Sequence, residues 1–322
     1  MAPGSGGGQT LWLFNKSSEI IRPIKKMRVL FIFIDGLGIG ERNPSYNPCG
    51  EDKTGILCNF SDECPREIPF QGVCIPLEAA LGIPDLPQSA TGQTALLTGV
   101  NAAKLNGKHR NGFPNKVLRE VLKEKSLLRQ LKEAGRKPIF MNAYRPIFFK
   151  LDDRFKWLLS TTTVANLAAG LPFFTLEDIA AGRSIYQDFT NKDLIRRGFQ
   201  IPEFTPEKAG EILGGQSRNY DFVLYEYFKT DRAGHSQDYE TAKVEIQKLG
   251  RFLERFLLTV DLSETQIILT SDHGNIEDLR VKTHTLNPVM TLLWGPLTNT
   301  WVERLHSLTD VTPTILSAFE KA

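Results

Sequence analysis

The chain has 322 residues, of which 41% are hydrophobic, 24% charged and 10% aromatic, the composition of an ordinary globular protein. Its 39 basic and 37 acidic residues give a formal net charge of +2, so no excess of positive charge points to nucleic acid as a partner. No segment reaches the roughly 18 uninterrupted apolar residues of a membrane span, so we expect no membrane partner either.

The N-terminal segment, residues 1–26, differs in composition from the rest of the chain. "MAPGSGGGQT" is glycine-rich and is predicted to be disordered, and "LWLF" is too short for the apolar core of a secretory signal. Met27 stands directly before the first convincing strand. We therefore expect residues 1–26 to be a disordered or non-native arm. The absence of an export signal predicts a cytoplasmic location.

The first predicted strand is "MRVLFIFIDG", a continuous β-branched and aromatic run that is typical of a strand buried on both faces of a parallel sheet. Residues 40–75, rich in Pro, Asn, Cys and Gly, are predicted to form a long loop. This loop holds all the cysteines of the chain: Cys49, Cys58, Cys64 and Cys74. Their spacing lacks the C-x2-C pairs of structural zinc sites. Disulfides or an irregular metal site stay open, but we favour free thiols.

The next segment, "LPQSATGQTALLTG", runs from a proline-marked turn into a helix-compatible stretch. It carries four hydroxyl residues: Ser89, Thr91, Thr94 and Thr98. A hydroxyl at a helix start can cap the free backbone N–H groups of the first turn. It can also be a nucleophile, where those groups and the helix dipole stabilise an incoming anion. Taken alone, the segment favours capping.

The rest of the chain alternates helices and strands. "SLLRQLKEAGRKPIFMNA" predicts a helix that ends near Gly135 and then a strand. Residues 145–215 are irregular, with aromatic clusters and short helices such as "TPEKAGEIL". The later elements are a strand in "YDFVLYEYF", a helix over 237–258, strands in "TQIILT" and "VMTLLWG", and a C-terminal helix in "DVTPTILSAF". This alternation predicts an α/β fold with a mainly parallel sheet.

Acidic residues and histidines follow the predicted strands, at the edge where α/β sheets bind their ligands. The aspartates are Asp35, Asp231 and Asp272, and the histidines are His235, His273 and His284, three of only five in the chain. Each one alone has a structural interpretation, such as an Asp-Gly turn. Together, mixed oxygen and nitrogen ligands suit Mn²⁺ or Zn²⁺ better than Mg²⁺ or Ca²⁺. A hydroxyl beside such an ion becomes a nucleophile.

The segments "FIFIDGLG", "SATGQTALLTG", "TDRAGH", "SDHGN", "THTLNPV" and "LTDVTPTIL" occur in the order seen in the alkaline phosphatase superfamily. The chain most resembles the metalloenzyme branch that contains cofactor-independent phosphoglycerate mutase and phosphopentomutase. The resemblance covers roughly 27–100 and 216–322 and implies a three-layer α/β/α sandwich. Residues 101–215 would then combine a core helix and strand with a small inserted cap. The resemblance also implies two divalent cations. One would be held by Asp35, Ser89, Asp272 and His273, and the other by Asp231, His235 and His284.

The resemblance also selects the nucleophile. In the mutases a hydroxyl residue is followed three positions later by Gly and then usually by His; here these positions are Ser89, Gly92 and Gln93. In the related nucleotide pyrophosphatases and phosphodiesterases, the nucleophile lies ten residues before the Gly of a Thr-Gly pair, and counting back from Gly99 again reaches Ser89. Thr91 is then predicted to be the cap, and Thr94 and Thr98 to be helix-packing residues.

The basic loop "NAAKLNGKHRNGFPN" follows the nucleophile segment. Together with Gln93, which replaces the usual His, it supplies the candidate substrate-binding residues: Asn106, Lys108, His109 and Arg110. The alternative is a solvated, charged turn that contacts no substrate. The sequence does not fix the oligomeric state.

From these residues we expect a two-metal enzyme that transfers a phosphoryl group from a small phosphorylated metabolite through a phospho-Ser89 intermediate. A phosphomonoester hydrolase is favoured, because residues 101–215 are short beside the inserts of the mutases resembled. The alternatives are a phosphomutase acting on phosphoglycerate or a phosphosugar, a phosphodiesterase or phosphonate hydrolase, and an inactive binding protein on the same scaffold.

Overall fold

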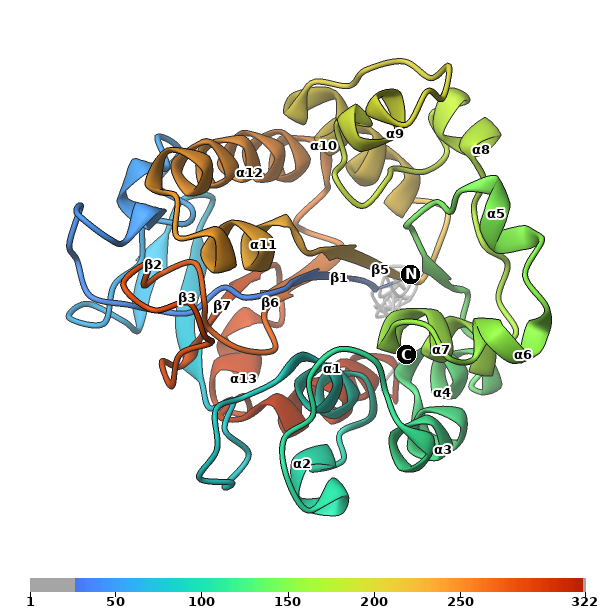
Figure 1. Ribbon diagram of the computed structural model, residues 1–322, viewed down its shortest axis with the longest axis horizontal. Coiled ribbons are helices and arrows are strands. Elements are labelled where there is room, and N and C mark those ends of the chain that lie inside the picture. The colour runs from blue at the N-terminus through green and yellow to red at the C-terminus, as the bar shows by residue number, and fades with distance from the viewer. Residues whose placement is uncertain (1–26, 321–322) are drawn as a thin grey trace, which may run out of the picture.

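A computed structural model describes residues 27–320, so the prediction for residues 1–26 lies outside the described part (Figure 1). The described chain forms a seven-stranded sheet in the order β2-β3-β7-β6-β1-β5-β4. The strands are β1 (Arg28–Ile34), β2 (Arg66–Ile68), β3 (Gly72–Leu77), β4 (Pro138–Phe140), β5 (Phe222–Tyr227), β6 (Thr265–Thr270) and β7 (Val289–Trp294).

The sheet confirms the predicted α/β class. Strands β4, β5, β1 and β6 run parallel, and in this region Phe33 of β1 lies opposite Glu226 on one side and Thr270 on the other. The pairs β6–β7, β7–β3 and β3–β2 are antiparallel. The carboxyl ends of β5, β1 and β6 therefore meet at one edge, with β1 in the middle.

Helices cover both faces of the sheet, as the side-chain alternation of β1 requires. Leu30, Ile32 and Ile34 pack on one side in a core with α10 (Pro206–Ser217) and α12 (Tyr239–Thr259). Val29, Phe31 and Phe33 pack on the other side against a second helical layer (Figure 1). This layer includes α1 (Ser89–Thr98), α3 (Lys116–Lys125), α4 (Leu127–Glu133), α7 (Thr161–Ala168) and α14 (Val311–Glu320).

Two regions depart in detail from what the sequence predicts. Within residues 40–75 the structure has a short helix, η1 (Pro48–Glu51), and the β2–β3 hairpin, whose strand β3 pairs with β7. Strand β2 has only three residues and β3 contains Pro76, which hides the alternation expected of a strand. All four cysteines are free thiols, with the Sγ atoms of Cys64 and Cys74 3.3 Å apart across the hairpin.

One part of residues 101–215 belongs to the sheet and its helical layer, and the other part forms loops and short helices. Strand β4 extends the sheet, and α3, α4 and α7 join its lower layer (Figure 1). Most of the remaining segments are loops with short helices, and they run along the right-hand side of Figure 1. The helices not yet given bounds are α2 (Ala102–Asn106), α5 (Pro146–Phe149), α6 (Asp153–Lys156), α8 (Leu176–Ala180), α9 (Lys192–Arg196), α11 (Lys229–Ser236), α13 (Thr298–Val302) and η2 (Leu308–Asp310). None of the helices within residues 27–320 has both the length and the apolar character that a bilayer crossing requires.

Candidate metal centre and phosphoryl-transfer site

The side chains that follow β1, β5 and β6 come together at the carboxyl edge of the sheet. Asp35 is the residue directly after β1, and Asp272 and His273 follow β6 by two and three positions. Asp231 and His235 lie one turn apart in α11, the short helix after β5, so both face the same side. The three strands are neighbours, and this adjacency joins residues far apart in the sequence.

One group of potential ligands consists of Asp231, His235 and His284. The Nε2 atom of His235 lies 3.4 Å from Asp231 Oδ2, and the Nε2 atom of His284 lies 3.6 Å from Asp231 Oδ1. In both histidines Nδ1 donates to a backbone carbonyl, of Lys282 and Pro87 respectively, each at 2.7 Å. Metal-binding histidines are oriented in this way, because the bond at one nitrogen leaves the other free for the ion.

The second group consists of Asp35, Asp231 and His273. The Nε2 atom of His273 lies 3.2 Å from Asp35 Oδ1 and 3.6 Å from Asp272 Oδ2. Asp35 Oδ1 is buried and has no well-directed hydrogen bond within the described chain, a costly state for a carboxylate that a cation would relieve. Asp231 thus contributes to both groups, whereas Asp272 is turned toward Gln93, whose Nε2 donates to it at 3.0 Å.

The charges of this centre are unbalanced without cations. Burial and the neighbouring Asp272 raise the pKa of Asp35 well above its ordinary range. Burial alone would lower the pKa of His273, but Asp272 and Asp35 outweigh it and raise that pKa to about 10. Burial and the positive His273 lower the pKa of His284 to about 4, so this ring is neutral at pH 7. The clustered aspartates and the neutral ring of His284 are donors that fit divalent cations.

Ser89 is the first residue of α1, and its Oγ lies 3.1 Å from His273 Nε2. The preceding residue, Gln88, provides no side-chain cap for the helix. Gly92 allows this approach: a Cβ atom there would lie 2.7 Å from the carbonyl oxygen of Asp272. The helix start can therefore contact the segment after β6 only with glycine at position 92.

Among the other hydroxyl residues of α1, Thr91 is predicted from the sequence to cap the helix. The structure shows a different role for this residue. Its Oγ1 donates to Gln88 O, lies 3.1 Å from His109 Nδ1, and accepts from the backbone N–H of Arg110. Thr91 therefore ties α1 to the loop after α2, a long-range contact that sequence spacing cannot reveal. Thr94 and Thr98 donate to carbonyls four residues earlier and are helix-packing residues, as predicted.

A cavity of about 590 Å³ opens beside Ser89, and among the predicted site residues Asp35, Ser89, Gln93 and Asp231 line it. The candidate substrate-binding residues of the loop do not: Asn106, Lys108, His109 and Arg110 are absent from its wall. His109 is buried and its Nε2 donates to Ala80 O, while Arg110 Nε donates to Phe113 O. The same loop instead lines the cavity with its next residues, Asn111, Gly112 and Phe113.

Sequence reasoning missed three polar residues near this site. The Nδ2 atom of Asn275 donates to Asp231 Oδ1 at 2.6 Å. Its place within "SDHGN", two residues after His273, is a signal by which the sequence could have indicated it. Glu277 is buried and accepts from Gly38 N, Asn275 N, Thr285 Oγ1 and Asn287 Nδ2, so it ties the segment after β1 to residues on both sides of His284. Glu226, a lone acid in an apolar strand, lines the cavity.

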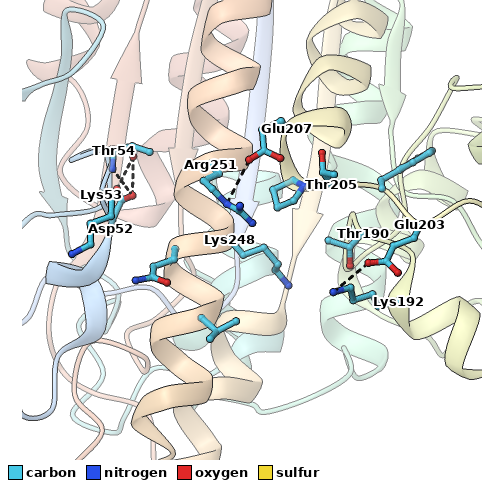
Figure 2. A pocket seen from close by; sticks show the side chains of 14 residues that line it. Asp52, Lys53, Thr54, Thr190, Lys192, Glu203, Thr205, Glu207, Lys248 and Arg251 are labelled. Atoms are coloured by element: carbon cyan, nitrogen blue, oxygen red, sulfur yellow. Dashed lines mark hydrogen bonds and ion pairs between the residues drawn. The ribbon is translucent and has the colours of Figure 1, made fainter.

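A second hollow lies on the other helical layer, between α12, α10 and residues 52–54 (Figure 2). None of the predicted site residues lines it. Its cationic side chains pair with acids around it: Lys192 with Glu203 at 3.2 Å and Arg251 with Glu207 at 3.5 Å, as the dashed lines in Figure 2 show. The charges of this hollow largely neutralise one another.

Residues 207–321 match a family model described as "Metalloenzyme superfamily". This part of the chain contains five of the predicted metal ligands: Asp231, His235, Asp272, His273 and His284. This C-terminal third of the chain is therefore similar to that family. The chain is 32% identical over 121 residues to the 2,3-bisphosphoglycerate-independent phosphoglycerate mutase of Yersinia pestis (strain Pestoides F), a match that covers 35% of the chain and 23% of the mutase. The mutase of Wolinella succinogenes is 32% identical over 120 residues, covering 36% and 24%.

The chain thus spans about a quarter of the length of the curated relatives that it matches. Among solved structures, the chain is similar to an alkaline phosphatase from the Antarctic bacterium TAB5, with a TM-score of 0.52 and 13% identity. The match covers 90% of this chain and 97% of the phosphatase. At this identity the similarity shows the fold, and it confirms the alkaline-phosphatase-like architecture that the sequence resemblance implies.

Proposed function

We propose that this protein is a divalent-metal-dependent phosphoryl-transfer enzyme in which Ser89 is the nucleophile. One observation carries the proposal: Ser89 Oγ, at the start of α1, lies 3.1 Å from His273 Nε2, one of the three histidines that form two potential ligand groups with Asp35 and Asp231. A helix N-terminus favours an anion at this position, which suits an incoming phosphate.

In this proposal the side chains of the site have separate roles. Asp35, Ser89, Asp272 and His273 would hold one divalent cation, and Asp231, His235 and His284 the other, with Asp231 facing both. When bound, such cations lower the pKa of a coordinated hydroxyl and neutralise charge on the transferred phosphoryl group. The hydrogen bond from Gln93 fixes the Asp272 carboxylate, and the carbonyls of Lys282 and Pro87 hold the two outer imidazoles in their ligand orientation.

The reaction forms a bond from Ser89 Oγ to phosphorus and breaks the ester bond, releasing the alcohol. Hydrolysis then requires water to reach phospho-Ser89, whereas a mutase must keep the alcohol bound and exclude water. We favour hydrolysis of phosphate monoesters, because exposed side chains such as Phe113 and Ile147 line the cavity, which opens to solvent. A phosphomutase is the second candidate, because the curated relatives from Yersinia pestis and Wolinella succinogenes are both mutases.

Two measurements test the proposal. Chelation should abolish turnover of a phosphate monoester, and Mn²⁺ or Zn²⁺ should restore it; full activity in protein shown to be metal-free by elemental analysis would contradict the metal centre. Ser89→Ala should lower kcat by about 10³-fold or more, because the bond-forming atom is removed. In ¹⁸O-labelled water, label in free phosphate supports a hydrolase, and an unlabelled isomeric phosphate identifies a mutase.

A further inference from the structure

The cavity beside Ser89 is lined by unlike sets of side chains. One set is Ser89, Asp35 and Asp231, where the phosphoryl group would be transferred. Polar side chains such as Arg145 and Arg197 also line the cavity, and a third, apolar set comes from four separate segments of the chain. These segments contribute Phe113 after α2, Ile147 and Phe148 of α5, Leu159 before α7, and Phe228 after β5. A wall assembled from four segments is a feature of the fold rather than of one loop.

The aromatic rings of this wall are held in place by one another. The ring centroids of Tyr144 and Phe148 are 4.3 Å apart, and Phe173 packs edge-on against both, at 4.8 and 4.7 Å. The Tyr144 hydroxyl is fixed by a 2.6 Å hydrogen bond with Thr163 Oγ1. Rings fixed before binding lose little conformational entropy when a ligand packs on them.

Two members of the wall are exposed although they are large and apolar. Phe113 is 58% exposed and Ile147 is 62% exposed, and both line the cavity. Water contact of such side chains is unfavourable, and grouped apolar exposure around a hollow is typical of a ligand-binding site. A short, highly polar leaving group such as a three-carbon acid would leave this wall in contact with water.

We infer that the natural substrate is a phosphate monoester of a bulky alcohol with a largely apolar, ring-containing body that packs against Phe113, Ile147, Phe148 and Tyr144. This inference rests on the proposed function and specifies its substrate class. The phosphoryl group would lie at Ser89, and the alcohol released in the first step would contact the apolar wall.

The test separates binding from turnover. Ethylphosphonate and 2-phenylethylphosphonate cannot be hydrolysed at phosphorus, and they differ in the ring; their binding to the Mn²⁺-loaded protein is measured by calorimetry. Ethyl phosphate and 2-phenylethyl phosphate are the matched esters, since both release a primary alcohol. We expect the ring to tighten phosphonate binding at least about tenfold and to raise kcat/KM of the ester by a similar factor.

Substitutions in the apolar wall test which side chains cause the preference for the ring. Ile147→Ser and Phe113→Ser should each reduce the preference for the ring several-fold, because they remove apolar surface from the wall. Phe155→Ser is the matched control: Phe155 is 56% exposed on the neighbouring α6 but does not line the cavity, so the preference should persist. All three positions are at the surface, and thermal unfolding confirms that the variants are folded.

The outcomes distinguish the two proposals. If both esters are turned over but the two phosphonates bind equally well, the substrate class is wrong and the phosphoryl-transfer function stands. If the ring is preferred in binding but neither ester nor any other phosphate ester reacts, the proposed function is wrong and the binding inference stands. An equal loss of preference in Phe155→Ser would also overturn the assignment of the apolar wall.

Discussion

Replacing Glu226 with Gln should stabilise the protein above neutral pH. Glu226 stands on the face of β5 where Phe222 and Leu224 belong to the apolar core, and its Oε2 accepts a 2.6 Å hydrogen bond from Thr162 Oγ1. Burial raises its pKa, the Thr162 hydrogen bond opposes this, and repulsion from Asp272 adds to it, giving a pKa of about 7 against an ordinary value of 4.5. The neutral carboxyl is therefore the form that the fold prefers.

The sign and size of the effect follow from linkage. Between pH 4.5 and about 7 the folded chain holds a proton that the unfolded chain has lost, so this contribution to stability disappears as pH rises through that window. At about 1.36 kcal/mol per pKa unit, the full loss is about 3 kcal/mol. Glu226→Gln cannot ionise, and its amide oxygen can still accept from Thr162. It should match the parent near pH 4.5 and exceed it by up to about 3 kcal/mol at pH 8.

The assay is urea unfolding of the chelated protein at pH 5 and pH 8, read by circular dichroism. Glu254→Gln, a carboxyl-to-amide change at an exposed position on α12, is the control and should not reproduce the difference between the two pH values. Equal destabilisation of Glu226→Gln at both pH values would refute the reasoning, because it would mean that Glu226 is ionised in the folded protein throughout.

Three further changes test other parts of the site. Thr91→Val should cost about 1–2 kcal/mol in urea unfolding, because His109 and the Arg110 N–H lose a partner, yet kcat should persist; loss of turnover would make Thr91 the nucleophile. Glu277→Ala should destabilise the fold by about 3 kcal/mol or more, because four donors lose their acceptor; a change below 1 kcal/mol would contradict its structural role. His235→Ala should lower the metal content of the loaded protein from two ions to one by elemental analysis, whereas two retained ions would remove His235 from the ligand set.

The sequence predicted the parts of the fold that depend on local pattern. The buried runs of β1, β5 and β6 and the apolar face of α12, with Ala242, Ile246 and Leu249 fully buried, appear where periodicity indicates them. The aspartates after parallel strands were predictable for the same reason, since such strand ends share one edge. The short β2–β3 hairpin carries too few residues for its period to be seen.

What the sequence did not reveal depends on contacts between distant segments. The role of Thr91 follows from the position of His109, 18 residues later, and that of Glu277 from its contacts with Gly38 and Thr285. The basic loop after α2 was predicted to bind substrate through its charged residues. The structure turns the loop so that its neutral residues 111–113 line the cavity instead. Which residues of a loop face a cavity depends on tertiary packing and not on the composition of the loop.

The position of Asp231 between both ligand groups has a thermodynamic consequence. Because one carboxylate faces both groups, the occupancy of either position changes the free energy of filling the other, and the coupling is reciprocal. Asn275 Nδ2 donates to the same Oδ1 atom that faces His284, so a cation held by this oxygen would compete with the hydrogen bond. Metal titrations of the chelated protein should therefore depart from the isotherm of two independent sites, and the protein should fill with metal more steeply or more gradually than a single-site system would.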